Sequence, residues 1–194
     1  MAQGLERIQN VAALPTQSRV FVGLWPEDAL QPTLLKHAQH AQQHCGGRVM
    51  RDHHWHITLA YVGVCSCEQV IDVAQAVKQL SLSLPPLTLS QYGAFKNAKV
   101  VWLGPDPQSV APEVQALHQA HRQVWQRLHA LGWRNDERGY VPHVSLLRDA
   151  QAAGLSALQL EHPLRWHHRA CYVIASFPER DTNRYVIVDD ARLA

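Results

Sequence analysis

The stretch Tyr140-Val-Pro-His-Val-Ser-Leu-Leu-Arg148 places a histidine, a hydroxyl two residues later and an arginine soon after within an apolar frame. The first half of the chain holds a near copy, Trp55-His-Ile-Thr-Leu-Ala-Tyr-Val-Gly63. Both contain His-x-(Thr/Ser)-Leu among residues that favour β-strands. A chain that carries this pattern twice, once in each half, is expected to build one site from two halves.

Each motif is expected to present two polar side chains on one face of a strand. Side chains at positions i and i+2 point to the same side of a strand. His56 therefore projects together with Thr58, and His143 projects together with Ser145. The apolar residues that alternate with them are expected to face the core, namely Ile57, Leu59, Val144 and Leu146.

Two such edges facing each other suit phosphoester chemistry without a metal. Near neutral pH one imidazole can be neutral and take a proton from water, while the other can be protonated and give its proton to the leaving oxygen. The hydroxyls of Thr58 and Ser145 can donate to phosphoryl oxygens, and the guanidinium of Arg148 matches a phosphate. Strict alternation puts Arg148 opposite His143, so its contribution requires the strand to end or bulge near Leu147.

The chain around the motifs predicts α+β architecture with mostly antiparallel sheet. Strands are expected over 19–25, 49–62, 87–92, 99–103, 169–177 and 184–188, as well as in the second motif. Helices are expected after Pro26, from the Ser66 cap to Leu80, and from Pro112 to a stop at Gly132. Residues 1–17 are predicted to be a loose lead-in, and residues 18–194 a single domain of two similar lobes with a cleft between them.

Composition indicates an ordinary globular protein. The 194 residues are 46% apolar and 18% charged, with a formal net charge of +2. No apolar run reaches the roughly 18–20 residues that span a bilayer, and the N-terminus lacks a signal-peptide core, so a cytoplasmic protein with four reduced cysteines is expected. The mildly basic balance permits a phosphate-bearing partner, but the sequence pI of about 8.4 is below that of dedicated nucleic-acid binders.

The paired motifs resemble the signature of the 2H phosphoesterase superfamily. More narrowly, from about Arg19 onward the chain is similar to the bacterial RNA 2′,3′-cyclic phosphodiesterases, historically called 2′-5′ RNA ligases. Further segments share the likeness: Arg19–Pro26, Val100–Gly104, Pro142–Asp149, Ser176-Phe177 and Arg184-Tyr185.

The resemblance implies two lobes related by a pseudo-twofold axis and hydrolysis of RNA 2′,3′-cyclic phosphate ends to 2′-phosphomonoesters. It implies His56 as the proton donor to the departing 3′ oxygen and His143 as the base that activates water. Thr58, Ser145 and Arg148 would bind the phosphate. No cofactor or metal is implied, the partner would be RNA or an oligonucleotide with a cyclic phosphate end, and a monomer away from membranes is expected. The family also joins RNA ends reversibly through a 2′-5′ linkage.

Two other interpretations remain open. His54 and His56 could both reach one zinc ion from a strand, with Cys65 or Cys67 as a further ligand. Alternatively, the chain could be a non-catalytic RNA-binding module whose scattered arginines line a groove, with aromatic side chains stacking on bases. The second interpretation leaves the paired histidines without a purpose.

Overall fold

The structure is a computed structural model that describes residues 5–135, 139–179 and 182–193. Its helices are α1 (Gln31–Cys45), α2 (Cys67–Lys78) and α3 (Pro112–Ala130). Its strands are β1 (Glu6–Arg7), β2 (Gln17–Pro26), β3 (Arg48–Val49), β4 (Ile57–Ser66), β5 (Ser81–Leu82), β6 (Leu87–Leu89), β7 (Gln91–Phe95), β8 (Val100–Gly104), β9 (Val144–Arg148), β10 (Leu164–Trp166), β11 (His168–Glu179) and β12 (Thr182–Leu193). Short 3-10 turns cover Val11–Ala13, Asp28–Leu30, Asp52–His54 and Ala152–Ala157. The predicted α+β class is confirmed.

One long sheet runs through the molecule in the order β1-β12-β11-β2-β4-β9-β8-β7, with β5 beside β12 and β3 beside β9. Its pairs are antiparallel except β1 and β5, which each run parallel to β12. The two motif strands β4 and β9 meet at the centre through one residue pair, Ile57 and Val144. This join divides the sheet into two lobes. The first lobe contains β1, β12, β11, β2 and β4, and the second contains β9, β8 and β7. β6 and β10 form a separate antiparallel pair.

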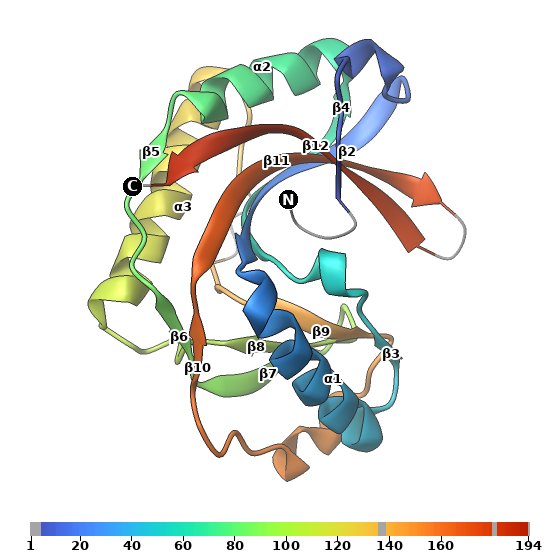
Figure 1. Ribbon diagram of the computed structural model, residues 1–194, viewed down its shortest axis with the longest axis vertical. Coiled ribbons are helices and arrows are strands. Elements are labelled where there is room, and N and C mark those ends of the chain that lie inside the picture. The colour runs from blue at the N-terminus through green and yellow to red at the C-terminus, as the bar shows by residue number, and fades with distance from the viewer. Residues whose placement is uncertain (1–4, 136–138, 180–181, 194) are drawn as a thin grey trace.

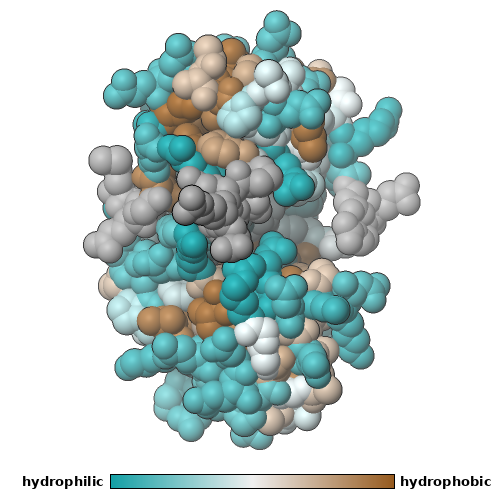
Figure 2. Space-filling view, turned by 90° about the vertical axis from the view of Figure 1, so that its right-hand side faces the viewer, coloured by the Kyte–Doolittle hydropathy of each residue, from teal (hydrophilic) through white to brown (hydrophobic). Residues whose placement is uncertain are grey.

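The two lobes are interleaved along the sequence, and neither corresponds to one half of the chain. The carboxy-terminal hairpin β11–β12 joins β2 and β4 in the first lobe, where α2 and α3 also pack. Helix α1 follows β2 in sequence but packs against β9 and β3 of the second lobe (Figure 1). Figure 2 shows hydrophilic side chains over much of one face, with apolar side chains between them. None of the described helices is long and apolar enough to cross a bilayer.

The helix boundaries follow local chemistry. Ser66 and Gln69 form the predicted capping box, in which the Ser66 hydroxyl accepts from the Gln69 backbone and the Gln69 side chain accepts from the Ser66 backbone. The last turn of α3 leads into Gly132, whose φ of 89° lies in the left-handed region that glycine tolerates. Helix α1 begins only at Gln31, because Pro26 ends β2 and a 3-10 turn intervenes.

Several stretches differ from the sequence-based prediction. The strand expected over 87–92 is divided into β6 and β7, which pair with different strands. The strand expected over 49–62 begins only at Ile57, because a 3-10 turn occupies Asp52–His54, and each motif histidine therefore immediately precedes its strand. The lead-in expected over residues 1–17 is packed from Leu5 onward, because β1 finds a free edge at β12. Leu5 and Leu14 are both buried there.

Candidate active site

The join between the lobes brings the two motifs face to face. Ile57 pairs with Val144 in an antiparallel ladder. The same register sets His56 across from Ser145 and Thr58 across from His143, and cross-strand neighbours share a face. The four polar side chains therefore lie on one side of the sheet, as predicted. The apolar residues on the other side, Ile57, Leu59, Val144 and Leu146, are each at most 1% exposed.

The backbone anchors both imidazoles in the same way. Nδ1 of His56 lies 2.7 Å from the carbonyl oxygen of His54, and Nδ1 of His143 lies 2.8 Å from that of Val141. A carbonyl can only accept, so Nδ1 carries the hydrogen in both rings. In the neutral form the lone pair is then on Nε2, and this atom takes up or releases the proton. His56 and His143 therefore have the same tautomer, and each can exchange a proton through Nε2.

Aromatic rings enclose His56. Phe21 and Trp25 stack on its ring with centroid distances of 4.8 Å each, and Tyr185 approaches edge-on at 5.8 Å. Burial in this box is the main cause that lowers the pKa of His56 to about 3, with smaller contributions from the charges of His143, His54 and Arg148. The free protein therefore holds His56 neutral near pH 7. Leu5 belongs to the same apolar cluster as Phe21 and Trp25, so the N-terminal segment helps to close this box.

His143 has a more open environment. Phe95 meets its ring edge-on at 4.7 Å, and Trp102 lies tilted at 6.0 Å. Burial lowers the pKa of His143, the hydrogen bond to Val141 raises it, and the positive charge of Arg148 lowers it. The two histidines thus share an anchor but differ in their neighbours.

A β-bulge brings Arg148 to the polar face. Consecutive residues Trp102 and Val101 of β8 pair with Ser145 and Leu147, which leaves Leu146 as an extra residue in β9. One extra residue reverses the alternation that follows it. Arg148 therefore shares the face of Ser145, as its predicted part in phosphate binding requires. After burial, its positive charge is one of the causes that lower the pKa of both motif histidines, in agreement with this placement. Burial raises the pKa of Tyr185, and the charge of Arg148 partly offsets that rise.

The first motif contains the same irregularity, which strict alternation along a strand does not predict. Gly23 pairs with Thr58 while the preceding Val22 pairs with Ala60, so Leu59 is the extra residue in β4. The bulge puts Tyr61 on the face of Thr58, in the position that Arg148 has in the other motif. Tyr61 is 57% exposed, an unusual exposure for a large ring. Its spacing of three residues after Thr58 matches that of Arg148 after Ser145, and this was the available signal.

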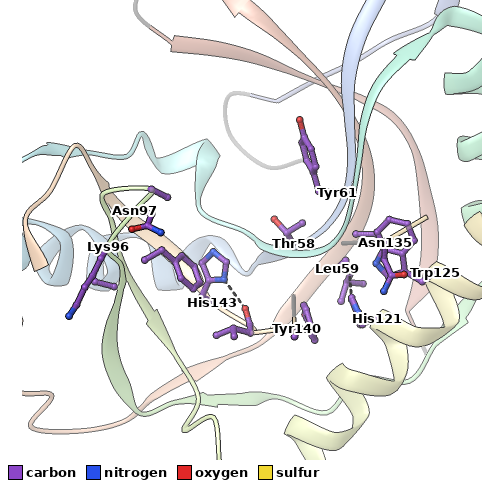
Figure 3. Close-up of a pocket in the computed structure, with 16 residues that line it drawn as sticks. Thr58, Leu59, Tyr61, Lys96, Asn97, His121, Trp125, Asn135, Tyr140 and His143 are labelled. Atoms are coloured by element: carbon purple, nitrogen blue, oxygen red, sulfur yellow. Dashed lines mark hydrogen bonds between the residues drawn. The ribbon is translucent and has the colours of Figure 1, made fainter. Parts of the chain in front are cut away.

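A cavity of about 770 Å³ opens beside the motifs. Thr58 and His143 lie in the middle of its lining, between Lys96 and Asn97 on one side and the α3 residues His121 and Trp125 on the other (Figure 3). Nδ1 of His121 donates to the carbonyl of the bulge residue Leu59 at 2.6 Å. The cavity thus extends from the paired motifs to helix α3.

The zinc interpretation lacks ligands among the described residues. No group of three or more His, Cys, Asp or Glu side chains that could hold a metal occurs in the described part of the chain. Cys65 and Cys67 lie at the far end of β4 from His56, and each thiol is near a backbone carbonyl instead. His54 packs against the ring of Tyr185.

Comparisons with solved structures define the fold class. Escherichia coli LigT complexed with 3′-AMP superposes with a TM-score of 0.75 at 21% identity, covering 92% of this chain and 99% of LigT. A protein described as a phosphoesterase gives 0.70 at 21% identity over 91% and 98% of the two chains. TT0787 of Thermus thermophilus gives 0.65 at 17% identity over 89% and 96%. The chain has the two-lobed fold of these proteins.

The sequence model of the 2′-5′ RNA ligase superfamily matches residues 26–174, and the chain belongs to this family. Its members are enzymes that act on phosphoesters. No curated protein matches the chain.

Proposed function

We propose that the protein hydrolyses 2′,3′-cyclic phosphate ends of RNA to 2′-phosphomonoesters, with His56 as the proton donor and His143 as the proton acceptor. The observation that carries this proposal is the pair of imidazoles with identical Nδ1 anchors, two hydroxyls and one guanidinium on a single face of the sheet. Such a set can move two protons and neutralise a phosphate without a metal.

In the proposed reaction, Nε2 of His143 takes a proton from water as the water oxygen forms a bond to phosphorus. The bond between phosphorus and O3′ breaks, and Nε2–H of His56 gives its proton to O3′. Thr58 and Ser145 donate to the non-bridging oxygens, and Arg148 offsets their growing charge. Burial lowers the pKa of His56 to about 3 in the free protein, so the donor role requires that the bound phosphate anion bring the proton to Nε2.

The surroundings of the motifs favour RNA as the substrate. Arg48 lies directly across from Arg148 between β3 and β9. Two arginines in such a pair repel each other unless an anion lies between them or nearby. Tyr61 offers an exposed aromatic face on which a nucleobase can stack. A monomer is sufficient in this proposal, because both motifs come from one chain.

The test is incubation with a nucleoside 2′,3′-cyclic phosphate in the presence of EDTA, followed by identification of the product isomer. The expected product is the 2′-phosphate, and His56→Ala and His143→Ala are expected to lose roughly 10²–10⁴-fold in kcat. His40→Ala on an exposed face of α1 is the matched control and retains activity. A 3′-phosphate product would reverse the assignment of the leaving oxygen. Inactivation by EDTA would favour zinc, and binding of RNA without turnover would favour the non-catalytic module.

A further inference from the structure

The N-terminal segment at Leu5 lies on the side of the sheet that carries the motif side chains. In the parallel pair of β1 with β12, Glu6 is opposite Val186. The same register sets Leu5 beside Tyr185, and residues at matching positions of paired strands point to the same face. Leu5 is 6% exposed and belongs to one apolar cluster with Phe21, against which Tyr185 also packs. Leu5 is therefore part of a second layer behind the aromatic rings of the site.

Two of these rings connect Leu5 to His56. Tyr185 lies edge-on to His56 at 5.8 Å between ring centroids, and Phe21 stacks on the same imidazole at 4.8 Å. The rings of Tyr185 and Phe21 also meet each other at 5.2 Å. Leu5 therefore acts on the histidine through these rings, by keeping them packed and water out.

Burial is the largest cause that lowers the pKa of His56 in the free protein, ahead of the charges near it. Among the described residues, the titratable and charged groups that face His56 from the surrounding elements are His54, His143, Arg148 and Tyr185. A substitution at Leu5 leaves each of these groups in the chain. It therefore changes the burial of the imidazole and removes no charge beside it.

Leu5 is also the main anchor of the N-terminal segment on this face of the sheet. β1 contributes two residues to the sheet, and its ion pairs lie at the surface, Glu6 with Arg184 and Arg7 with Asp190. Exposed ion pairs contribute little to stability and are screened by salt. The apolar contacts of the buried Leu5 side chain therefore decide how firmly the rings are covered.

We propose that Leu5 is a positioning residue for the proposed proton donor, and that the segment Leu5–Arg7 is a strap that keeps water away from His56. The inference rests on the proposed function, because it concerns the acid strength of the donor. With the strap in place, water does not stabilise a charged imidazole, so His56 holds its proton only while a phosphate anion is bound beside it. The proton is then released readily to O3′. When the strap is loosened, the imidazolium is hydrated and His56 becomes a weaker acid.

The test measures the pKa of His56 by NMR, from the chemical shift of its Cε1 nucleus, in the full-length chain without substrate. Leu5→Ala is expected to raise this pKa by about one pH unit. Leu5→Val should give a smaller rise, and Leu5→Met, which keeps the apolar volume, should keep the wild-type value. Leu14→Ala is the matched control, because Leu14 is buried in the separate apolar cluster that includes residues of α2. It is expected to lower the thermal midpoint as Leu5→Ala does and to leave the pKa of His56 unchanged.

The outcomes separate this inference from the proposed function. With adenosine 2′,3′-cyclic phosphate as substrate, the alkaline limb of kcat/KM is expected to move to higher pH in Leu5→Ala and to stay in place in Leu14→Ala. An unchanged pKa of His56 in both Leu5→Ala and Leu5→Val, or an equal rise in Leu14→Ala, would overturn the strap. If Leu5→Ala does not fold, Leu5→Val decides alone. A wild type without turnover would overturn the proposed function, while the NMR titration, which needs no substrate, still tests the strap.

Discussion

At the scale of single residues, the two histidines differ in their neighbours, while their own geometry is the same. Both donate from Nδ1 to a carbonyl two residues earlier. His56 packs against the neighbouring rings of Phe21 and Trp25, and His143 borders an open cavity. The environment therefore decides which imidazole is the stronger acid.

The pKa shifts predict an acid-shifted pH profile. The productive free form has one protonated and one neutral imidazole, and burial lowers the pKa of both below the usual value, that of His56 to about 3. Because protonation is lost as pH rises through these values, kcat/KM is expected to fall tenfold per pH unit on the alkaline side, starting below about pH 6.5.

Arg148 supplies the control for this profile. Its charge lowers both pKa values, so Arg148→Met is expected to raise them and to move the alkaline limb to higher pH. Arg148→Lys keeps the charge and should leave the limb in place. A limb that does not move in Arg148→Met would contradict the placement of this charge.

Gly23 is a second position where the surroundings of His56 can be tested. A Cβ at Gly23 would lie 3.0 Å from Cζ3 of Trp25 and 3.2 Å from Cδ2 of His56. Gly23→Ala is therefore expected to displace the imidazole and to reduce kcat by about ten- to a hundredfold. The thermal midpoint is measured alongside kcat, and equal losses of activity and folded protein would point to unfolding instead.

At the scale of elements, the two bulges determine what each motif strand presents. Leu146 and Leu59 are the extra residues, and Arg148 and Tyr61 reach the polar face because of them. The carbonyl of Leu59 receives the hydrogen bond from His121 of α3. A helix of the first lobe thus fixes the irregular backbone beside the site.

His121 tests this contact. His121→Leu removes the donor to a buried carbonyl, which is expected to cost about 1–3 kcal/mol of unfolding free energy and to lower kcat. His121→Asn places an amide nitrogen close to the position of Nδ1 and is expected to recover most of both. His118→Leu, one turn away on α3, is the control for loss of a histidine there. Equal behaviour of the leucine and asparagine variants at position 121 would contradict a role for the hydrogen bond.

The sequence predicted the polar faces of the motifs correctly because alternation is a local property. The side chains at His56, Thr58, His143 and Ser145 follow from the i to i+2 rule. Bulges at Leu59 and Leu146 depend on the neighbouring strands β2 and β8, which local alternation does not encode. For the same reason local alternation did not predict the placement of Tyr61 on the polar face, or the packing of the N-terminal segment on β12.

At the scale of the whole molecule, interleaving makes the two lobes one structural unit. Helix α1 packs on the second lobe although β2, which precedes it, lies in the first. One continuous cluster of buried residues includes side chains from both lobes. Neither lobe has a contiguous chain segment from which to fold alone.

Cooperative unfolding follows from this arrangement. In urea, the far-UV and near-UV circular dichroism signals are expected to change in a single coincident transition. Separate midpoints for the two signals would indicate that the lobes unfold independently. Val110→Phe, at an exposed site, serves to show that surface changes leave the midpoint unaltered.

The arginine pair at the β3–β9 edge predicts how salt affects different substrates. Hydrolysis of a cyclic-phosphate oligonucleotide is expected to weaken with rising salt more steeply than that of a mononucleotide. For the oligonucleotide, the logarithm of kcat/KM is expected to fall linearly with the logarithm of salt concentration. Arg48→Ala should reduce the steepness of this line by about 0.7 if the Arg48 side chain contacts one phosphate of a single strand. Arg127→Ala, on the last turn of α3, is a matched loss of charge away from that edge. Equal slopes in Arg48→Ala and the wild type would remove Arg48 from the RNA path.

The join at Ile57 and Val144 has a consequence for how such an enzyme could change its product. The local twofold axis passes through this pair and exchanges one motif with the other, so neither histidine is committed by its own sequence to giving or taking the proton. In the proposed reaction, the surroundings of the two histidines decide which of them gives the proton: aromatic rings pack against His56, and a cavity lies beside His143. Under this proposal, substitutions around the two histidines would allow the same pair to release O2′ in place of O3′. The position of the cleaved bond could then change in evolution while both motifs stay the same.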